Sequence, residues 1–372
     1  MRRGRRAARL NLALQGGGAH GAFTWGVLDR LLEEEDIELG WVSGTSAGAV
    51  NAVALAAGLA DGGRAGAKAR LAAVWGAVQR AGIPDFLRSN PLLAGMAQFA
   101  GLLSPYDFNP LGFDPLRRLL EAEVDFALIR ARAPVELLIA ATNVATGRCR
   151  LFRNGDIGID TVLASACLPT LHHAVEIDGE AYWDGGFSAN PDIVTLARES
   201  PVADTLIVQI TPIARNGTPR DVRAIAAQAN RITFNQPLLR DIELITTVRE
   251  TYRGGIRDWL PWRRTGWAGL VHHRFHLVEA GRYTRALGED TKLQPDKGLL
   301  TYLHGAGRTE MHKWLARHAA AIGRRETIDL AEAFRPRSEG ENAQSGGPGT
   351  APSDEAEPGA AAPLSGSRSP AP

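Results

Sequence analysis

Short apolar runs alternate with longer amphipathic segments from about residue 10 to residue 335, and this alternation constrains the fold more than any other feature. The predicted strands are Leu10–Leu14, Trp41–Ser43, Val135–Thr142, Cys149–Phe152, Val175–Ile177, Ala181–Trp183, Thr205–Ile210 and Phe275–Val278. Helices are expected to begin near Gly21, Ala47, Gly66, Pro115, Asp160, Pro191, Pro219 and Arg308. Such a pattern predicts an α/β fold with a mostly parallel central sheet covered by helices.

The composition narrows the classes of function. A chain of 372 residues accommodates two average domains or one large α/β domain. The 42 Lys and Arg residues nearly balance the 41 Asp and Glu residues, which argues against a surface built to bind nucleic acid. Cys149 and Cys167 are too few for a disulfide framework and form no metal-type CxxC pair, so we expect no structural metal.

The two ends of the chain differ from the middle. Residues 1–9 form a basic arm, and the apolar run that follows is too short for a signal peptide. No stretch reaches the ~18 consecutive apolar residues of a membrane-spanning helix, so we expect a cytoplasmic protein with at most peripheral contact at the inner membrane surface. Residues 336–372 hold seven of the 21 prolines and one large apolar residue, which predicts a disordered tail.

A glycine-rich loop, Gly16–Gly21, follows the first predicted strand and opens the first helix. Glycines there leave backbone N–H groups uncovered at a helix N-terminus, which suits an anion. The loop also matches the GxGxxG spacing of dinucleotide sites through Gly16, Gly18 and Gly21. Taken alone, it is compatible with an oxyanion hole, a nucleotide phosphate loop or a plain tight turn.

A second motif favours the first of these interpretations. Residues 44–48 read Gly-Thr-Ser-Ala-Gly, a GxSxG placed between a short strand and an Ala-rich helix. This is the context of a nucleophile elbow, in which the small residues Gly44 and Gly48 let the chain hold Ser46 in a strained, exposed turn. A dinucleotide site would instead place an acidic residue at the end of the second strand.

A serine nucleophile needs a positioned base. Asp178-Gly179 lies between two short apolar runs and is typical of a hairpin turn. Asp184 ends the second run and is followed by Gly185 and Gly186, which leave its carboxylate uncovered. The alternative is a Ser-His-Asp triad that uses His172 or His173.

The glycine loop, GxSxG and Asp-Gly-Gly, in this order and with Asn190-Pro191 just beyond, resemble the patatin-like phospholipase family over about Leu10–Ile210. The resemblance implies a three-layer α/β/α fold. It also implies an acyl hydrolase of phospholipids, lysophospholipids or related glycerolipids that forms an acyl-enzyme and needs no cofactor.

The same resemblance assigns roles to individual residues. Ser46 matches the nucleophile and Asp184 the general base of a Ser-Asp dyad. The oxyanion hole matches the loop amides of Gly16, Gly17, Gly18 and Ala19. One position departs from the family pattern, because His20 stands where Arg or Lys is common, and we expect His20 to pack the loop.

We expect a hydrolase core over residues 10–212 and an accessory α-rich region over 213–335 packed on it. The apolar segment Leu92–Leu103 is a candidate lid, pocket wall or buried helix. The alternating Trp and Arg residues of Trp259–Trp267 suit a membrane interface. Among the remaining histidines, the group of His272, His273 and His276 lacks the partners of a metal site and is expected at the surface or in packing.

Two other classes of function compete with a lipid acyl hydrolase. One is a nucleotide-binding or regulatory protein that uses the glycine loop for phosphate, and the other is a catalytically silent scaffold. The sequence indicates no head-group preference, acyl position or oligomeric state.

Overall fold

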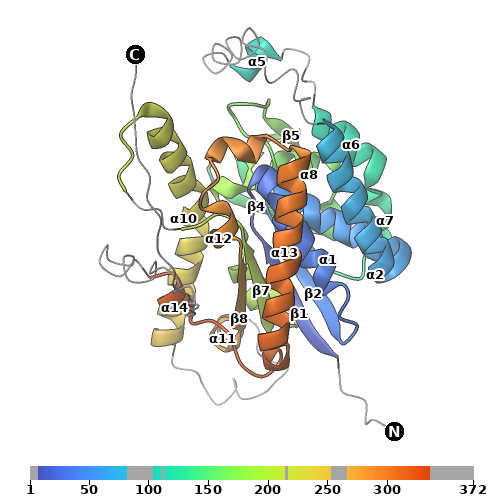
Figure 1. Cartoon of the computed structure of the whole chain (residues 1–372), viewed down its shortest axis with the longest axis vertical. Helices are drawn as coiled ribbons and strands as arrows, with labels where there is room; N and C mark the ends of the chain where they lie inside the picture. The colour runs from blue at the N-terminus through green and yellow to red at the C-terminus, as the bar shows by residue number, and fades with distance from the viewer. Residues whose placement is uncertain are drawn as a thin grey trace, which may run out of the picture. The chain divides into compact units, whose positions relative to one another are not determined.

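The centre of the computed structural model is an eight-stranded, mostly parallel sheet (Figure 1). The structure describes residues 7–81, 104–109, 112, 114–213, 217–252 and 266–335. The strands are β1 Ala8–Leu14, β2 Ile37–Gly44, β3 Leu137–Asn143, β4 Cys149–Phe152, β5 Val175–Ile177, β6 Glu180–Asp184, β7 Asp204–Gln209 and β8 Arg274–Glu279. All eight predicted strands are present.

The strand order is β5-β6-β3-β2-β1-β7-β8, with β4 also paired to β3. The five strands from β3 to β8 in this order run parallel. The pairs β3–β4, β3–β6 and β5–β6 are antiparallel. The sheet therefore has a parallel body and an antiparallel edge, and β6 runs back toward the body.

Six helices within the described residues begin within three residues of a predicted start, and five short helices have no predicted counterpart. The helices are α1 Ala22–Leu31, α2 Ala47–Ala81, α5 Pro105–Phe108, α6 Pro115–Glu123, α7 Phe126–Arg132, α8 Ile159–Ser165, α9 Val194–Glu199, α10 Val222–Thr251, α11 Trp267–His272, α12 Gly281–Thr284, α13 Lys297–His318 and α14 Leu330–Ala333. Short 3-10 turns are η1 Gly18–Gly21, η2 Asn154–Asp156, η3 Gly185–Phe187, η6 Glu289–Leu293 and η7 Ala319–Ala321. None of these helices is both long and apolar enough to cross a membrane.

Two helix boundaries are instructive. The predicted start near Arg308 is wrong, because α13 begins at Lys297, where the Asp296 carboxylate accepts the N–H of Leu299 and caps the first turn. The two helices predicted from Ala47 and Gly66 form one element interrupted by a kink at Gly62–Gly63, where the backbone leaves helical geometry.

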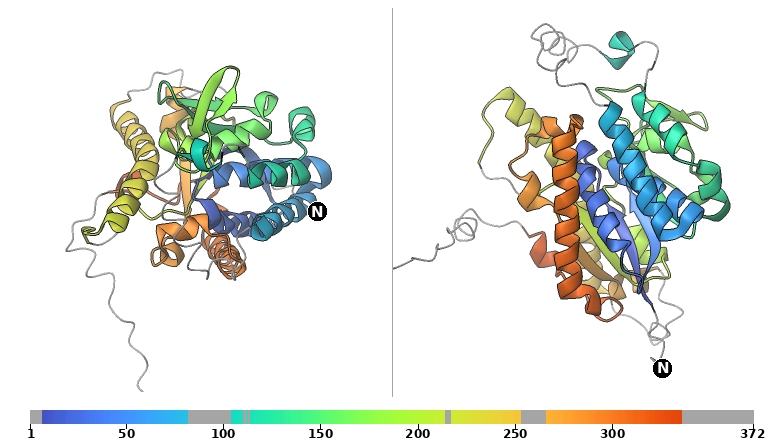
Figure 2. Two further views of the ribbon diagram at one scale, coloured as in Figure 1. Left: turned by 90° about the horizontal axis from the view of Figure 1, so that it is seen from above. Right: turned by 45° about the vertical axis from the view of Figure 1, so that its right-hand side comes forward.

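Helices cover both faces of the sheet (Figure 2). On β1, Leu10, Leu12 and Leu14 belong to a large hydrophobic cluster that also contains residues of α1, α2 and α13. Ala13, on the opposite face, belongs to a second cluster with residues of α9, α10, α11 and α14. This alternation gives the three-layer α/β/α architecture and confirms the predicted fold class.

The C-terminal part of the described chain is built into this architecture. β8 continues the sheet parallel to β7, and α13 packs along α1 (Figure 1). The two helices approach closely through glycines: a Cβ on Gly26 would stand 2.0 Å from the carbonyl oxygen of His304, and one on Gly307 would stand 2.0 Å from that of Phe23. The predicted boundary near residue 212, between a hydrolase core and an accessory region, stays a prediction.

Several predictions concern residues outside those that the structure describes. They are most of the basic arm, the apolar segment Leu92–Leu103, the Trp/Arg segment up to Thr265 and the tail 336–372. Of the Trp/Arg segment, Gly266 and Trp267 are described. Trp267 is partly exposed, and the guanidinium of Arg198 lies over its ring at 5.1 Å.

Two glycines on α13 offer a matched test of the contact with α1. Gly307→Ala should lower the free energy of unfolding by about 1–3 kcal/mol, because the new methyl group meets the α1 backbone. Gly305→Ala should be neutral or stabilising by up to about 1 kcal/mol, because nothing lies within 4 Å of its Cβ position and Ala is the better helix former. Urea unfolding of both variants measures the difference, and equal midpoints would contradict the close contact.

Candidate active site

Strand register brings the three sequence motifs together at the end of the sheet where the parallel strands β1 and β2 finish. Leu14 of β1 pairs with Gly44 of β2, so the glycine loop and the GxSxG turn leave the sheet side by side. Gly44 in turn pairs with Ile139 of β3, and Asp184 pairs with Ala141, two residues further along β3. Because Ser46 is also two residues beyond Gly44, the antiparallel strand β6 delivers Asp184 level with it.

Ser46 occupies the turn between β2 and α2. Its φ is 53°, the left-handed region that non-glycine residues rarely adopt, so the turn is strained as a nucleophile elbow requires. The Ser46 N–H donates to Ser165 Oγ at 3.0 Å, and Thr45 Oγ1 donates to the Ala189 carbonyl at 2.8 Å. These two bonds hold the turn from outside the motif.

The two glycines of the motif are required by close packing. A Cβ on Gly44 would stand 2.6 Å from the Gly48 carbonyl oxygen, and one on Gly48 would stand 2.1 Å from the carbonyl oxygen of Leu14. Both contacts are to backbone, which cannot move aside cheaply. Small residues therefore let α2 begin directly against the end of β1.

The glycine loop lies beside the elbow, and one of its backbone N–H groups is already hydrogen bonded. The Gly16 N–H donates to Asn190 Oδ1 at 2.8 Å, so this amide is unavailable and the expected oxyanion loop narrows to the next three residues. Within the described part of the chain, no acceptor takes the N–H of Gly17, Gly18 or Ala19. Gly18 has φ 57°, and a Cβ there would stand 2.2 Å from the Lys292 carbonyl oxygen.

Asp184 is almost wholly buried. Its Oδ1 accepts the Gly186 N–H at 2.7 Å, while Oδ2 has no hydrogen-bond partner among the described residues. Burial raises the pKa of Asp184 to about 7, and the Gly186 amide and the nearby Ser46 hydroxyl oppose that rise because they favour the ionised form. A carboxylate with this pKa can accept and return a proton near neutrality.

The glycines after Asp184 pack tightly rather than merely leaving space. A Cβ on Gly185 would stand 2.2 Å from the Ala140 carbonyl oxygen, and one on Gly186 would stand 2.3 Å from the Phe234 ring. The predicted Asp178-Gly179 hairpin is confirmed, with φ 55° and 80° at its two central residues.

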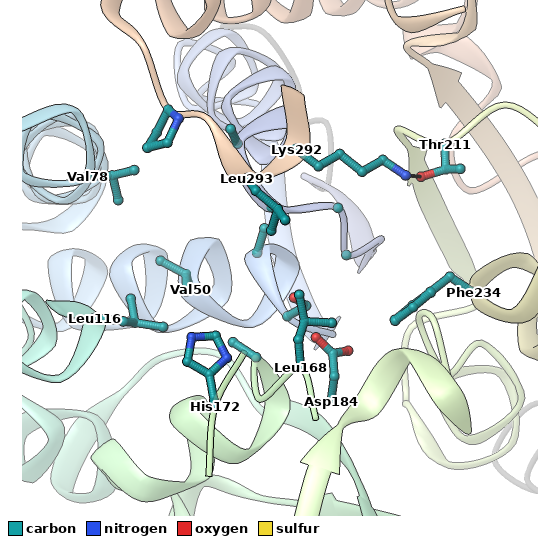
Figure 3. Close-up of a pocket in the computed structure, with 18 of the residues that line it drawn as sticks. Val50, Val78, Leu116, Leu168, His172, Asp184, Thr211, Phe234, Lys292 and Leu293 are labelled. Atoms are coloured by element: carbon teal, nitrogen blue, oxygen red, sulfur yellow. Dashed lines mark hydrogen bonds between the residues drawn. The ribbon is translucent and has the colours of Figure 1, made fainter. Parts of the chain in front are cut away.

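A cavity of about 410 Å³ opens over these residues (Figure 3). Its lining is mostly apolar on one side, where Val50, Val78 and Leu116 lie. Above Asp184 in this view, the Lys292 side chain extends toward Thr211. The complete lining is Gly16, Gly17, Gly18, Ala19, Ser46, Ala47, Val50, Trp75, Val78, Leu116, Ala166, Leu168, His172, Asp184, Thr211, Asn230, Phe234, Lys292, Leu293 and Pro295.

The two histidines near the site, the candidates for a triad, make other contacts in the structure. His172 lines the cavity, and burial lowers its pKa. The ring of His173 hydrogen bonds to the Pro105 carbonyl at 3.1 Å and stacks on Tyr106. Among the described residues, no hydrogen bond joins either histidine to Ser46.

His20 packs the loop, as expected. It is buried, its Nε2 lies 2.7 Å from Thr291 Oγ1, and burial together with the Lys292 charge lowers its pKa to about 4. His20 is therefore neutral at physiological pH and supplies no cation.

The C-terminal histidines lie away from the cavity. His273 hydrogen bonds to Thr205 at 2.6 Å, and His276 lies 3.1 Å from Asp204 and 2.9 Å from Thr327. Both are buried packing residues.

Sequence reasoning missed several residues that hold the site together. Ser165 accepts the Ser46 N–H, and Gln15 Oε1 accepts the N–H groups of Ile210 and Thr211, both at 2.8 Å. Lys292 and Phe234 come from segments far along the chain. Only the polar Gln15 between the first strand and the glycine loop carried a local signal.

The buried carboxylate predicts a pH-dependent stability. Because burial raises the native pKa of Asp184 from 3.8 to about 7, its favourable contribution is complete below pH 3.8 and is lost as pH rises through 7. Asp184→Asn, which stays neutral, should therefore gain stability relative to the wild type by about 2–3 kcal/mol between pH 5 and pH 8. Thermal unfolding at both pH values tests this, and a difference independent of pH would contradict it.

The sequence model of a known family matches half of this chain. The sequence model of the Patatin family, described as patatin-like phospholipase, matches residues 12–197. Among solved structures, VipD from Legionella pneumophila is similar at 17% identity and a TM-score of 0.37, covering 84% of this chain and 67% of that one. A comparison with curated protein sequences finds no match. On the family match, which spans the glycine loop, the elbow and Asp184, the chain belongs to the patatin-like phospholipase family of lipid acyl hydrolases.

Proposed function

We propose that the protein hydrolyses fatty-acyl esters of phospholipids, lysophospholipids or related glycerolipids through a Ser46–Asp184 dyad. The observation that carries the proposal is the strained elbow serine beside a buried carboxylate with a pKa of about 7, at a cavity with an apolar wall. Family membership supports lipid esters as the substrate class.

Acylation uses the groups that line the cavity. The ionised Asp184 accepts the Ser46 hydroxyl proton as Oγ attacks the ester carbonyl, and the resulting oxyanion lies against the amides of Gly17, Gly18 and Ala19. When the intermediate collapses, the proton on Asp184 passes to the leaving alcohol oxygen. The fatty acid is then held as an ester of Ser46.

Deacylation repeats the same proton path with water. Asp184 takes a proton from the water that attacks the acyl-enzyme, and the amides again receive the oxyanion. Collapse of this second intermediate returns the proton to Ser46 Oγ and releases the fatty acid. The two steps call for no cofactor, because Ser46 and water supply the nucleophiles and Asp184 accepts and returns the proton.

The apolar wall supports a fatty-acyl substrate. Val50, Val78 and Leu116 offer hydrocarbon contact on one side of the dyad, where an acyl chain would displace water from apolar surface. Peripheral membrane contact through the Trp/Arg segment and the basic arm remains part of the proposal. The nucleotide-binding alternative is less well supported, because β2 ends at Gly44 and is followed by Thr45 and Ser46 rather than by the acidic residue that would bind a ribose.

Covalent labelling tests the nucleophile. A fluorophosphonate probe should label the wild type and not Ser46→Ala, because the phosphonate bonds to the activated Oγ. Asp184→Asn should slow labelling and ester turnover by at least about 100-fold, the lower range for loss of a general base. His172→Gln, in the same cavity, is the matched control and should stay within about tenfold of the wild type. Unchanged labelling of Ser46→Ala would refute the dyad. Loss of ester turnover in a His172→Gln variant that is still folded would favour a triad.

The pH profile tests the base. Asp184 acts only when ionised, and its pKa is raised to about 7, so kcat/KM should fall about tenfold per pH unit below 7 and level off above it. Initial rates on a water-soluble short-chain ester, measured from pH 5 to pH 9, show this fall in kcat/KM directly. A flat profile down to pH 5 would show that the base has an ordinary carboxylate pKa.

A further inference from the structure

One cationic side chain lines the catalytic cavity. Among the described residues, Lys292 is the single Lys or Arg in the lining, and its Nζ lies 3.3 Å from Thr211 Oγ1. Its backbone is fixed as well, because the Lys292 carbonyl oxygen faces Gly18 so closely that no Cβ would fit between them. The ammonium group is therefore directed by contacts at both ends of the residue.

The Lys292 ammonium group adds a positive charge to a cavity whose other lining residues are mostly apolar. In Figure 3 the ammonium end of Lys292 and Thr211 lie above and to the right of Asp184, whereas Val78 and Leu116 lie to its left. The charge also acts on the glycine loop, since Lys292 helps to lower the pKa of His20. Because His20 is neutral, the loop itself adds no second cation.

We propose that Lys292, oriented by Thr211, binds the phosphate of a glycerophospholipid substrate and so selects phosphate-bearing esters over neutral glycerides. This inference rests on the proposed function. An ester held at Ser46 with its acyl chain against Val50, Val78 and Leu116 carries its glycerol away from them, toward Lys292. In a glycerophospholipid the phosphate is one glycerol unit from the acyl ester, and an ammonium group is a natural partner for it.

Paired substrates test this selectivity. Lysophosphatidylcholine and a monoacylglycerol with the same acyl chain differ only in the head group. Lys292→Met should lower kcat/KM for the lysophospholipid by about 10- to 100-fold, the range expected for loss of a charged hydrogen bond, and change the monoacylglycerol value by less than about threefold. Lys292→Arg should recover most of the loss because it restores the charge.

Lys297 provides the matched control. It is an exposed lysine at the start of α13, close in sequence to Lys292 but outside the cavity lining, so Lys297→Met should leave both substrates unchanged. The inference would be overturned if Lys292→Met lowered kcat/KM equally for both substrates, or lowered it for neither. Loss of turnover in Ser46→Ala alone concerns the proposed function and not the selectivity.

A binding measurement keeps the inference testable without turnover. Calorimetry on Ser46→Ala protein with short-chain lysophosphatidylcholine below its micelle concentration should show affinity about tenfold higher than that of the Ser46→Ala, Lys292→Met double variant. Inorganic phosphate serves as a further arm and should compete only weakly. Equal affinity in the two variants, or phosphate alone binding as tightly as the lysophospholipid, would refute a head-group site.

Discussion

The burial of one carboxylate is the constraint on which the candidate site depends. Asp184 lies in the interior with one oxygen bonded to the Gly186 amide and the other without a partner among the described residues. Loss of hydration raises its pKa to about 7, which suits the general-base role that we propose for it beside Ser46. That position costs stability at neutral pH, so the surrounding contacts must hold the carboxylate in place.

Those contacts are largely backbone packing. Gly185 approaches the Ala140 carbonyl, Gly186 approaches Phe234, and Gly48 approaches the Leu14 carbonyl, each at a distance that excludes a Cβ atom. The result is a site whose atoms are positioned mainly by close packing at strand ends and helix starts, while the side chains of Ser165 and Asn190 add hydrogen bonds to it. Rigid positioning of this kind favours catalysis because little reorganisation is needed as charge develops.

The family match ends at residue 197, but several residues beyond it also line the cavity. Phe234, from α10, packs against Gly186, Lys292, from η6, lies against Gly18, and Leu293, also from η6, lines the cavity. The region after residue 212 also adds β8 to the sheet and packs α13 against α1. Ser46, Asp184 and the glycine loop thus come from the matched region, whereas part of the cavity wall comes from the later one.

The sequence alone determined the alternation of strands and helices, all eight strands and the three motifs, because these depend on local periodicity and on glycines at fixed offsets. It missed the start of α13 and the bond that engages the Gly16 amide. Only the tertiary structure decided that Asp184 stands level with Ser46, since that follows from the antiparallel register of β6 on β3. It likewise decided the pKa of Asp184 and the place of Lys292, because burial and contacts between distant segments leave no pattern in the local sequence.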